Sequence, residues 1–440
     1  MNASTGSGTG TALTPTPTAP APAPPRRNLR PWAVAGVAAV AIVTAGAFTT
    51  LAGLLVGPLH SEFGWSRGSI GVAMAVNMVV YGATAPFAAA LMDRFGMRRV
   101  IGGSLALIAT GAAGTLTMGE VWQLVLYWGV FVGLGSGAAS MVFAATLTER
   151  WFVARRGLVA GLLTAASVFG QFVFLPVLSR VVAGPGWRTA TLSLAVAAAV
   201  ATPLVAAFLR DHPADVGRLP HGAREFVPRP EPVSGAAGRA VRTLVSASRT
   251  APFWLLAGIF AVCGASTNGV MWSHFAPAAH DHGMPVTAAA SVLALIGIFN
   301  VAGTVASGWL TDRYDARRLL AAYFAVRGLS LLVLPLLFAA TLNAPLVAFA
   351  VVFGLLDVAT VPPTIALARE HFGSRGAIVF GWVNAGHQLG AGAVAFGGGV
   401  ARDLFGSYDV VWVTTAALCA AAALLALVVR RPRPAGHPAP

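Results

Sequence analysis

The sequence AALMDRFGMRR at residues 89–99 returns in related form as GWLTDRYDARR at residues 308–318. Each stretch places an Asp-Arg pair before an Arg-Arg pair, and the two stretches lie 219 residues apart. The same offset relates further charged and turn-forming residues: Pro58 and Pro277, Glu62 and Asp281, Gly64 and Gly283, Arg150 and Arg369, and Arg156 and Arg375. Because this offset needs no gaps, the sequence predicts two halves that share one architecture.

Apolar residues dominate the chain between these stretches. Of its 440 residues, 56% are hydrophobic and 10% are charged, and the mean hydropathy of +0.74 excludes an ordinary soluble domain. Windows of about 20 apolar residues, each long enough to cross a bilayer as a helix, recur along the chain. We expect spans at residues 32–58, 68–92, 99–118, 121–148, 157–183, 188–209, 252–279, 287–311, 318–341, 345–368, 376–401 and 408–429. The predicted fold is an all-α polytopic membrane protein with twelve transmembrane helices in two pseudo-symmetric six-helix halves.

The net charge of +14 is unevenly distributed, and all 29 basic residues are Arg. With the N-terminus inside, 24 of them lie on one side of the membrane, four lie on the other, and Arg327 falls within a span. This is the positive-inside bias, and it predicts a multi-pass protein of the cell (cytoplasmic) membrane with both termini in the cytoplasm. The basic charge is therefore a topology signal, and we expect no nucleic-acid partner.

Five segments follow from these spans. We expect a disordered cytoplasmic tail at 1–31, the N-terminal half at 32–209, a cytoplasmic linker at 210–251, the C-terminal half at 252–429, and a second cytoplasmic tail at 430–440. Cys263 and Cys419 each fall within a span without metal-ligand spacing, so we expect them to be packing residues. The sequence predicts no cofactor and no metal, and transport by one chain does not require an oligomer.

Both repeated stretches resemble the signature loop of the major facilitator superfamily, G-x-L-x-D-R-x-G followed by basic residues, and the resemblance covers residues 32–430. Ala89 replaces the first Gly of one copy, and Asp315 replaces the second Gly of the other. The resemblance implies a transporter whose loop acts as a latch that favours the outward-facing state. An Asp at the end of a span can accept hydrogen bonds from a neighbouring helix N-terminus or from a nearby Arg.

Such bonds form only when the two halves are closed on the cytoplasmic side. We therefore interpret the following residues as gating or latch residues: Asp93, Arg94, Asp312, Arg313, Arg156 and Arg375. The alternative is that the Arg residues of these loops serve topology alone, and we favour topology for most of the Arg-Arg pairs.

Three further stretches resemble the monocarboxylate transporter and oxalate–formate antiporter branch: FGWSR at 63–67, WFVARRGLVAG at 151–161 and GWR at 186–188. This resemblance implies small organic anions as substrates. In monocarboxylate transporters span eight carries an Asp and an Arg four residues apart, and the Arg binds the substrate carboxylate. Asn300 and Thr304 stand at those positions here, and the chain has no Lys for span one. An anionic substrate must therefore find its positive charge elsewhere.

Ionisable residues within the spans break the internal repeat. Arg327, Asp357 and His387 have only apolar counterparts in the first half, and charges in hydrocarbon are costly, so each is a candidate for substrate or proton binding. Asp357 is either a proton-coupling carboxyl or a structural partner that Arg327 keeps ionised, and both interpretations stay open. His387 is either a ligand or a packed histidine. Pro362 and Pro363 predict a bend in span ten that frees carbonyl acceptors beside Asp357, for packing or for a binding site.

Polar residues elsewhere in the spans are lesser candidates. His274 lies near the outer end of span seven, where we expect a vestibule or gate position rather than a metal site. Asn77 and Tyr81 on span two and Gln171 on span five are cavity candidates, although hydrogen bonds between helices explain them equally well.

The sequence thus predicts a secondary active transporter that moves a small organic anion by alternating access, with or against a proton. Two similar membrane halves commonly place such a path at their interface. The expected partners are the small-molecule substrate, protons and the lipid bilayer. An exporter of amphipathic drugs or metabolites is the alternative, favoured by the missing carboxylate-binding Arg. A non-transporting membrane sensor is a further alternative. An enzyme is not expected, because the sequence shows no nucleophile, metal set or phosphate loop.

Overall fold

The computed structural model describes residues 30–172, 174–226 and 235–429, and within these ranges the protein is α-helical without a β-sheet. Most of the expected tail at 1–31, and all of the expected tail at 430–440, lie outside the described residues. The N-terminal half contains α1 (Arg30–Phe63), α2 (Arg67–Phe95), α3 (Met97–Thr115), α4 (Val121–Leu124), the π-helical turn η1 (Val125–Val132), α5 (Gly133–Ala138), α6 (Met141–Trp151), α7 (Arg156–Phe172), α8 (Phe174–Ala183) and α9 (Trp187–Phe208).

The C-terminal half follows the same plan. It contains α11 (Ala251–Gly264), the π-helical turn η3 (Ala265–Met271), α12 (Trp272–Asp281), α13 (Val286–Thr311), α14 (Ala316–Val333), η4 (Leu334–Leu337), α15 (Ala344–Asp357), α16 (Val361–Phe372), η5 (Gly373–Arg375), α17 (Gly376–Phe405) and α18 (Asp409–Val428). Between the halves lie the short η2 (Pro213–Val216) and the helix α10 (Ala236–Ala247).

The helices match the twelve predicted spans. Among the described residues, 10 helical stretches are long and apolar enough to cross a membrane. One of these, residues 344–405, holds predicted spans ten and eleven, and α3 supplies span three. Polar caps mark several helix starts: the Ser66 hydroxyl accepts a hydrogen bond from the amide of Ser69, and the Asn343 side chain accepts one from Leu346. The twelve-helix, two-half fold is thus confirmed.

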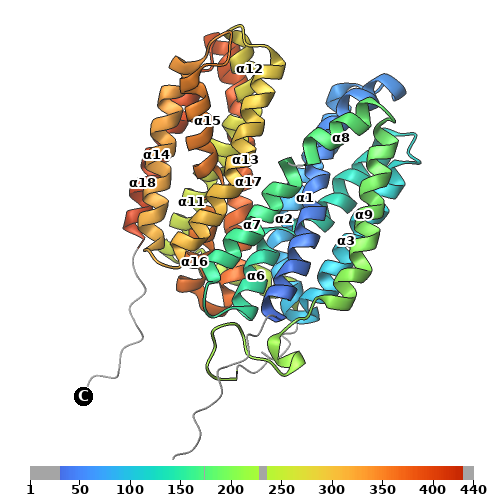
Figure 1. Ribbon diagram of the computed structural model, residues 1–440, viewed down its shortest axis with the longest axis vertical. Coiled ribbons are helices and arrows are strands. Elements are labelled where there is room, and N and C mark those ends of the chain that lie inside the picture. Colours follow the sequence, from blue (N-terminus) through green and yellow to red (C-terminus); the bar gives the residue numbers. More distant parts are fainter. Residues whose placement is uncertain (1–29, 173, 227–234, 430–440) are drawn as a thin grey trace, which may run out of the picture.

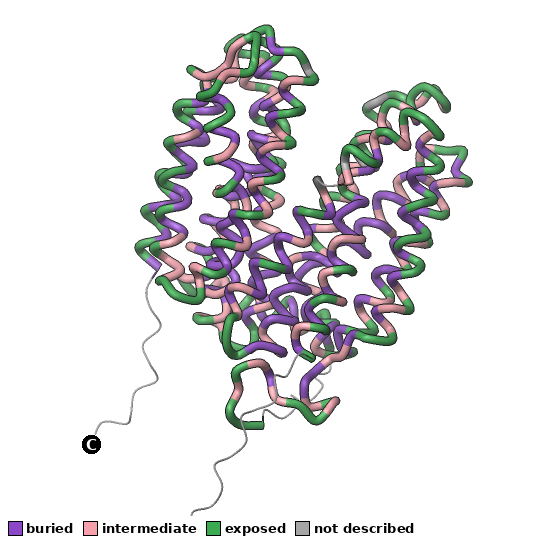
Figure 2. Tube along the Cα trace, in the orientation of Figure 1, coloured by how far each residue is buried: buried purple, intermediate pink, exposed green. Residues whose placement is uncertain are grey.

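The two halves meet at the end of the molecule that carries the linker and diverge toward the end that carries α8 and α12 (Figure 1). We call these the linker end and the open end. Two helix pairs make most of the contacts between the halves: α7 packs against α13, and α2 packs against α17. Each half has its own apolar core, and buried residues also gather where the halves meet near the linker end (Figure 2).

Spans four and ten are both broken at the same place in the internal repeat. Span four changes from α5 to α6 after Ala138, and span ten changes from α15 to α16 after Asp357, which lies 219 residues later. The bend in span ten was predicted from Pro362 and Pro363. The break in span four has no proline to announce it, so the sequence pattern missed it.

The linker is not featureless. The 12 residues of α10 pack against α2 of one half and α17 of the other. Ala236, Ala240 and Ala247 of α10 are buried, while Val241 and Val245 on its other face remain exposed. The predicted linker at 210–251 therefore contains a helix that touches both halves.

Candidate functional site

The break in span ten frees backbone groups near Asp357, the last residue of α15, from helical hydrogen bonds. Pro362 and Pro363 carry no N–H, so they cannot bond the carbonyls four residues earlier in the chain. The Val358 carbonyl instead accepts a hydrogen bond from the Val361 amide (3.1 Å), and the Ala359 carbonyl accepts one from a serine on α13. The broken helix is therefore held open by neighbouring groups, with the Asp357 side chain beside it.

The Asp357 carboxyl is fully buried and only half satisfied. Its Oδ2 accepts hydrogen bonds from Asn300 Nδ2 (2.9 Å) and Trp272 Nε1 (3.3 Å), which are both neutral donors. Its Oδ1 has no hydrogen-bond partner among the described residues. A buried carboxylate without a charged donor is costly, whereas a protonated carboxyl is tolerated far better. The surroundings therefore suit a carboxyl that can carry a proton.

The Arg327 guanidinium lies next to this carboxyl but bonds other groups. It is fully buried, and its Nη2 donates to the backbone carbonyls of Asp357 (2.6 Å) and Leu356. Its Nη1 donates to Ser266 Oγ (3.1 Å) and contacts Cys263 Sγ (3.6 Å). Among the described residues no ion pair joins the two side chains. Arg327 thus secures the broken backbone of span ten and places a positive charge close to Asp357.

His387 lies on α17 and packs against α11. The backbone of His387 packs closely on Gly264, and a Cβ at residue 264 would lie 2.9 Å from His387 Nδ1. The ring centroid is 5.0 Å from that of Phe260, and Nδ1 has no partner among the described residues. Because Cys263, the neighbour of Gly264, touches Arg327, α11 brings His387 and Arg327 to adjacent faces of one helix.

Asn300 and Thr304 belong to the same cluster. Thr304 Oγ1 donates to the Asn300 carbonyl (2.8 Å) and contacts Asn300 Oδ1 (3.2 Å). Asn300 Oδ1 also accepts a hydrogen bond from the Val358 amide (3.2 Å). The span-eight amide therefore binds both the carboxyl of Asp357 and the backbone just after it. The acidic group of the cluster is supplied by span ten, and span eight supplies its hydrogen-bond donor.

The other predicted membrane residues lie apart from this cluster. His274 Nε2 contacts the Ala395 carbonyl (3.0 Å) and joins α12 to α17. Asn77 Nδ2 donates to the Trp128 carbonyl (2.7 Å) and joins α2 to η1. Tyr81 is half-buried on α2, and Gln171 Nε2 lies 3.5 Å from a serine hydroxyl on its own helix. Among the described residues, none of these four side chains hydrogen-bonds to the Asp357 cluster.

At the linker end, Asp312 of α13 joins the two halves. Its Oδ1 accepts the amide hydrogen of Gly157 (2.6 Å), and its Oδ2 accepts that of Leu158 (2.8 Å). These amides form the N-terminus of α7, where the helix dipole favours a negative charge. The helices can approach this closely because Gly157 faces Gly308, the first glycine of the repeated loop.

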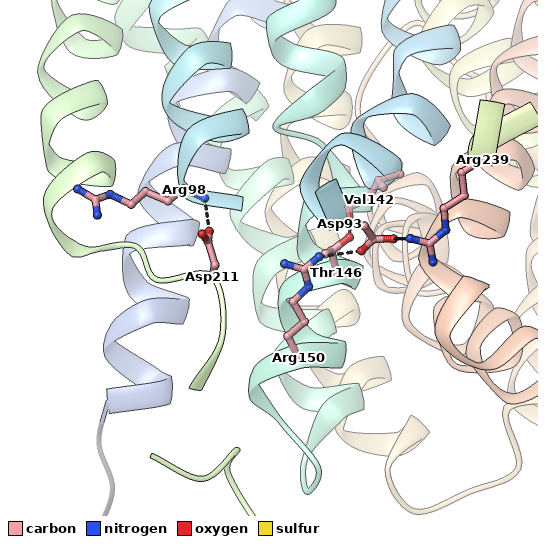
Figure 3. A network of polar contacts seen from close by, with 7 residues as sticks. All are labelled: Asp93, Arg98, Val142, Thr146, Arg150, Asp211 and Arg239. Atoms are coloured by element: carbon pink, nitrogen blue, oxygen red, sulfur yellow. Dashed lines mark hydrogen bonds and ion pairs between the residues drawn. The ribbon is translucent and has the colours of Figure 1, made fainter. Parts of the chain in front are cut away.

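Asp93, the repeat counterpart of Asp312, is bound differently (Figure 3). It pairs with Arg150 Nη2 (2.7 Å) on α6 and with Arg239 Nη1 (2.8 Å) on the linker helix α10. In the described part of the chain, Arg94 and Arg313 form no ion pair with either aspartate. Their guanidinium groups stack on Phe95 and Trp309, respectively, the neighbouring aromatic rings.

The helices that follow the two loops begin with different local contacts. Gly96 has φ of +87°, and its missing Cβ leaves room for the Asp211 carboxylate, which accepts the amide hydrogen of Arg98 (2.7 Å; Figure 3). In the second copy the side chain of Asp315 itself accepts the amide hydrogen of Arg317 (3.0 Å). Both helices that follow the loops are therefore capped by an aspartate, one from the linker and one from within the loop.

A cavity of about 580 Å³ lies between the halves at the linker end. Its charged lining comes from both halves and includes Glu149, Arg156, Asp312 and Arg369. Arg156 also donates to the Phe152 carbonyl, whereas Arg375 donates to Ser246 of α10 (3.1 Å). Sequence reasoning missed Glu149, although an acidic residue directly after an apolar window was a usable signal.

The chain resembles known proteins over most of its length. A family model described as Major Facilitator Superfamily matches residues 37–337 and 262–440. The Bacillus subtilis protein named uncharacterized MFS-type transporter YcxA is 27% identical over 357 residues, which are 80% of this chain and 83% of that one. Mouse monocarboxylate transporter 11 is 30% identical over 342 residues, which are 74% of this chain and 70% of that one.

Solved structures share the fold at low sequence identity. The proton:xylose symporter XylE has a TM-score of 0.69 at 16% identity and covers 92% of this chain and 97% of its own. FucP in the outward conformation has a TM-score of 0.64 at 15% identity, and the match covers 90% of this chain and 99% of FucP. These similar proteins are transporters rather than enzymes. With the family model matched across both halves, the chain belongs to the major facilitator superfamily.

Proposed function

We propose that this transporter moves a small organic anion together with a proton, and that the linker end faces the cytoplasm. The observation that carries the proposal is the arrangement of Asp357 and Arg327. These two buried ionisable groups lie side by side, and the described residues show no ion pair between their side chains. The similarity to monocarboxylate transporters, together with the positive-inside distribution of the Arg residues, supports it.

The mechanism follows from the charges of this pair. When Asp357 is protonated, its neutral carboxyl leaves the positive charge of Arg327 uncompensated. At an effective dielectric constant of about 20, a carboxylate about 5 Å from that charge is stabilised by about 3 kcal/mol. When Asp357 loses its proton, the site becomes neutral and this attraction to an anion is lost. Proton and anion therefore stabilise each other's binding.

The same cluster can couple binding to movement. Asn300 on α13 and Trp272 on α12 both donate to the Asp357 carboxyl, so a change in its protonation alters contacts to two neighbouring spans. Arg327 extends the connection to span seven, because it contacts Cys263 at the end of α11 and Ser266 in η3. His387 Nδ1, which has no hydrogen-bond partner within the described ranges, lies beside the same helix, and we assign His387 to substrate binding.

The closed linker end corresponds to an outward-facing state in this proposal. Asp312 latches the halves together through the Gly157 and Leu158 amides, and Asp93 latches the N-terminal half to the linker helix. Opening toward the cytoplasm requires the first set of bonds to break, because its partners belong to different halves. Alternating access then moves the Asp357 cluster from one side of the membrane to the other.

Transport by reconstituted vesicles tests the proposal. Purified protein in liposomes is given a panel of radiolabelled carboxylates with and without an inward proton gradient. We expect saturable uptake of at least one monocarboxylate, accelerated by the gradient. Asp357→Asn imitates the protonated carboxyl, so it should retain exchange of labelled for unlabelled substrate while losing net uptake driven by the gradient.

Asp403→Asn, the same change on an exposed residue of the C-terminal half, is the matched control and should behave as the wild type. Gradient-driven uptake that survives in Asp357→Asn would refute the role of this carboxyl. A complete lack of saturable carboxylate flux would refute the substrate class and favour export of amphipathic compounds instead.

A further inference from the structure

A basic cavity lies beside the linker helix, outside the membrane-embedded cluster. It has a volume of about 430 Å³, and it is lined by Arg239, Arg242, Thr243, Ser246, Ser374 and Arg375. Every one of these lining residues is cationic or carries a hydroxyl group. Three guanidinium groups and three hydroxyl groups therefore surround one hollow, and no carboxylate of the described residues lines it.

The positive charge of this cavity is only partly compensated. Arg239 pairs with Asp93 (2.8 Å). Arg375 Nη1 donates to the Ser246 hydroxyl (3.1 Å), which carries no charge. Arg242 has no carboxylate partner among the described residues and is exposed. Like charges that line one cavity repel one another, so an anion that enters the cavity relieves that repulsion.

The cavity joins two elements that belong to different parts of the fold. Arg242 and Ser246 lie on α10, whereas Ser374 and Arg375 lie in η5, directly before α17. The helix α10 already contacts α17 through Trp382, whose Nε1 donates to the Ala240 carbonyl (3.1 Å). Together with the bond from Arg375 to Ser246, this already joins the two elements, and a ligand bound between Arg242 and Arg375 would add a further connection.

We infer that this cavity binds a phosphate group, held between Arg242 of the linker helix and Arg375 at the start of span eleven. Guanidinium groups match the geometry of phosphate oxygens, and hydroxyl groups can donate to the remaining ones. A cavity of this size also accommodates a substituent attached to the phosphate. Bound phosphate ties α10 to α17 and so strengthens closure of the linker end.

The phosphate can come from a lipid headgroup or from a soluble compound. Val241 and Val245 lie one turn apart on the exposed face of α10, as in helices that lie on a bilayer surface. This favours a headgroup, and the two sources respond differently in one experiment. In the first arm, full-length protein is purified in detergent, and its melting temperature is followed against sodium phosphate, with sodium chloride at equal ionic strength as reference. In the second arm, nanodiscs of phosphatidylglycerol are compared with nanodiscs of phosphatidylcholine.

We expect stabilisation in at least one arm, with an apparent affinity that falls about tenfold in Arg242→Gln and in Arg375→Gln. Arg249→Gln removes the same charge from the linker outside the cavity and should leave the response unchanged. A response to free phosphate identifies a soluble ligand, and a response to phosphatidylglycerol alone identifies a headgroup. No response in either arm, or an equal loss in Arg249→Gln and Arg242→Gln, would overturn the inference.

Discussion

Asp312 of the C-terminal half accepts the backbone amide hydrogen of Gly157 in the N-terminal half, at 2.6 Å. The repeat predicts a mirror contact for Asp93, yet among the described residues Asp93 pairs with Arg150 and Arg239 instead. The difference follows from the departure at the first position of the loop. Gly308 lets α13 approach α7 directly, whereas Ala89 carries a Cβ at the corresponding place on α2. The linker helix then supplies the second partner that Asp93 would otherwise lack.

The two aspartates should therefore differ in their contribution to closure. Asp312 makes two charge-assisted bonds to a helix N-terminus, each contributing about 1.5–3 kcal/mol. Asp93 makes ion pairs that are partly exposed, and such pairs contribute about 0.2–1 kcal/mol. Ala366→Cys in the cavity at the linker end provides a reporter, because opening of that end widens the access of an alkylating reagent to this half-buried residue. We expect Asp312→Asn to raise the alkylation rate about tenfold, and Asp93→Asn to raise it less than fivefold.

Both native cysteines are buried, so they contribute little background to this measurement. Raising the salt concentration should increase alkylation of the Asp312→Asn protein further, because its remaining latch consists of screened ion pairs. Equal alkylation rates in the two aspartate variants would contradict the asymmetry.

Close contact between glycines is the second requirement for closure. In Gly161→Ala the new Cβ would lie 2.7 Å from the Thr304 carbonyl oxygen and 2.9 Å from Gly308 Cα, distances that force α7 and α13 apart. We expect faster alkylation of the same reporter cysteine and a melting temperature lowered by several degrees, the effect of about 1–3 kcal/mol of overpacking. Gly103→Ala is the control, because its Cβ would meet no atom within 4 Å on α3. An unchanged alkylation rate of the reporter cysteine in Gly161→Ala would show that close contact of α7 with α13 is not required for closure.

Local patterns sufficed to predict the helices and the bend beside Asp357. Apolar windows located the twelve spans, and the prolines at 362 and 363 located the bend that carries this carboxyl. The break in span four was missed because Ala139 and Ser140 carry no breaking signal, and only its partner in the repeat reveals it. A fixed offset between halves therefore carries information that no single window contains.

Contacts between distant residues could not be predicted from those patterns. The sequence leaves open whether Arg327 pairs with Asp357. That Arg327 binds backbone carbonyls rather than the carboxylate depends on how α14 packs against the broken span. Arg239 looked like one of seven topology residues in the linker, and only the packing of α10 on α2 brings it to Asp93. Both outcomes depend on tertiary structure.

Arg327 should be irreplaceable even by lysine. One guanidinium nitrogen donates to the Leu356 and Asp357 carbonyls, and another donates to Ser266. A single ammonium group cannot reach acceptors so far apart. Arg327→Lys should therefore leave buried acceptors unsatisfied and destabilise the protein by about 3 kcal/mol or more. Thermal unfolding monitored by size-exclusion chromatography measures this loss, with the exposed Arg180→Lys as control. Similar melting temperatures for the two variants would mean that the carbonyls of span ten do not need the guanidinium.

A carboxylate near the open end gives the protein a pH-dependent contact between α1 and α9. Trp187 Nε1 donates to Glu62 Oε2 (2.6 Å), and Arg188 pairs with Oε1. The hydrogen bond from Trp187, followed by that from Arg188, lowers the pKa of the Glu62 carboxyl below its ordinary value. Because the folded-state pKa is depressed, this contact stabilises the fold fully above the unfolded pKa of about 4.3 and is lost as the pH falls through the folded value.

Glu62→Gln should therefore flatten the acid side of the stability profile. The wild type should lose melting temperature more steeply than Glu62→Gln below about pH 4.3, and the two should differ by a constant amount above pH 6. The difference should stay below about 1 kcal/mol, because the carboxylate is largely exposed and its ion pair is screened. Glu225→Gln removes an exposed carboxylate in the linker and should keep the slope of the wild type. Parallel acid slopes in wild type and Glu62→Gln would show that protonation of Glu62 does not release α1 from α9.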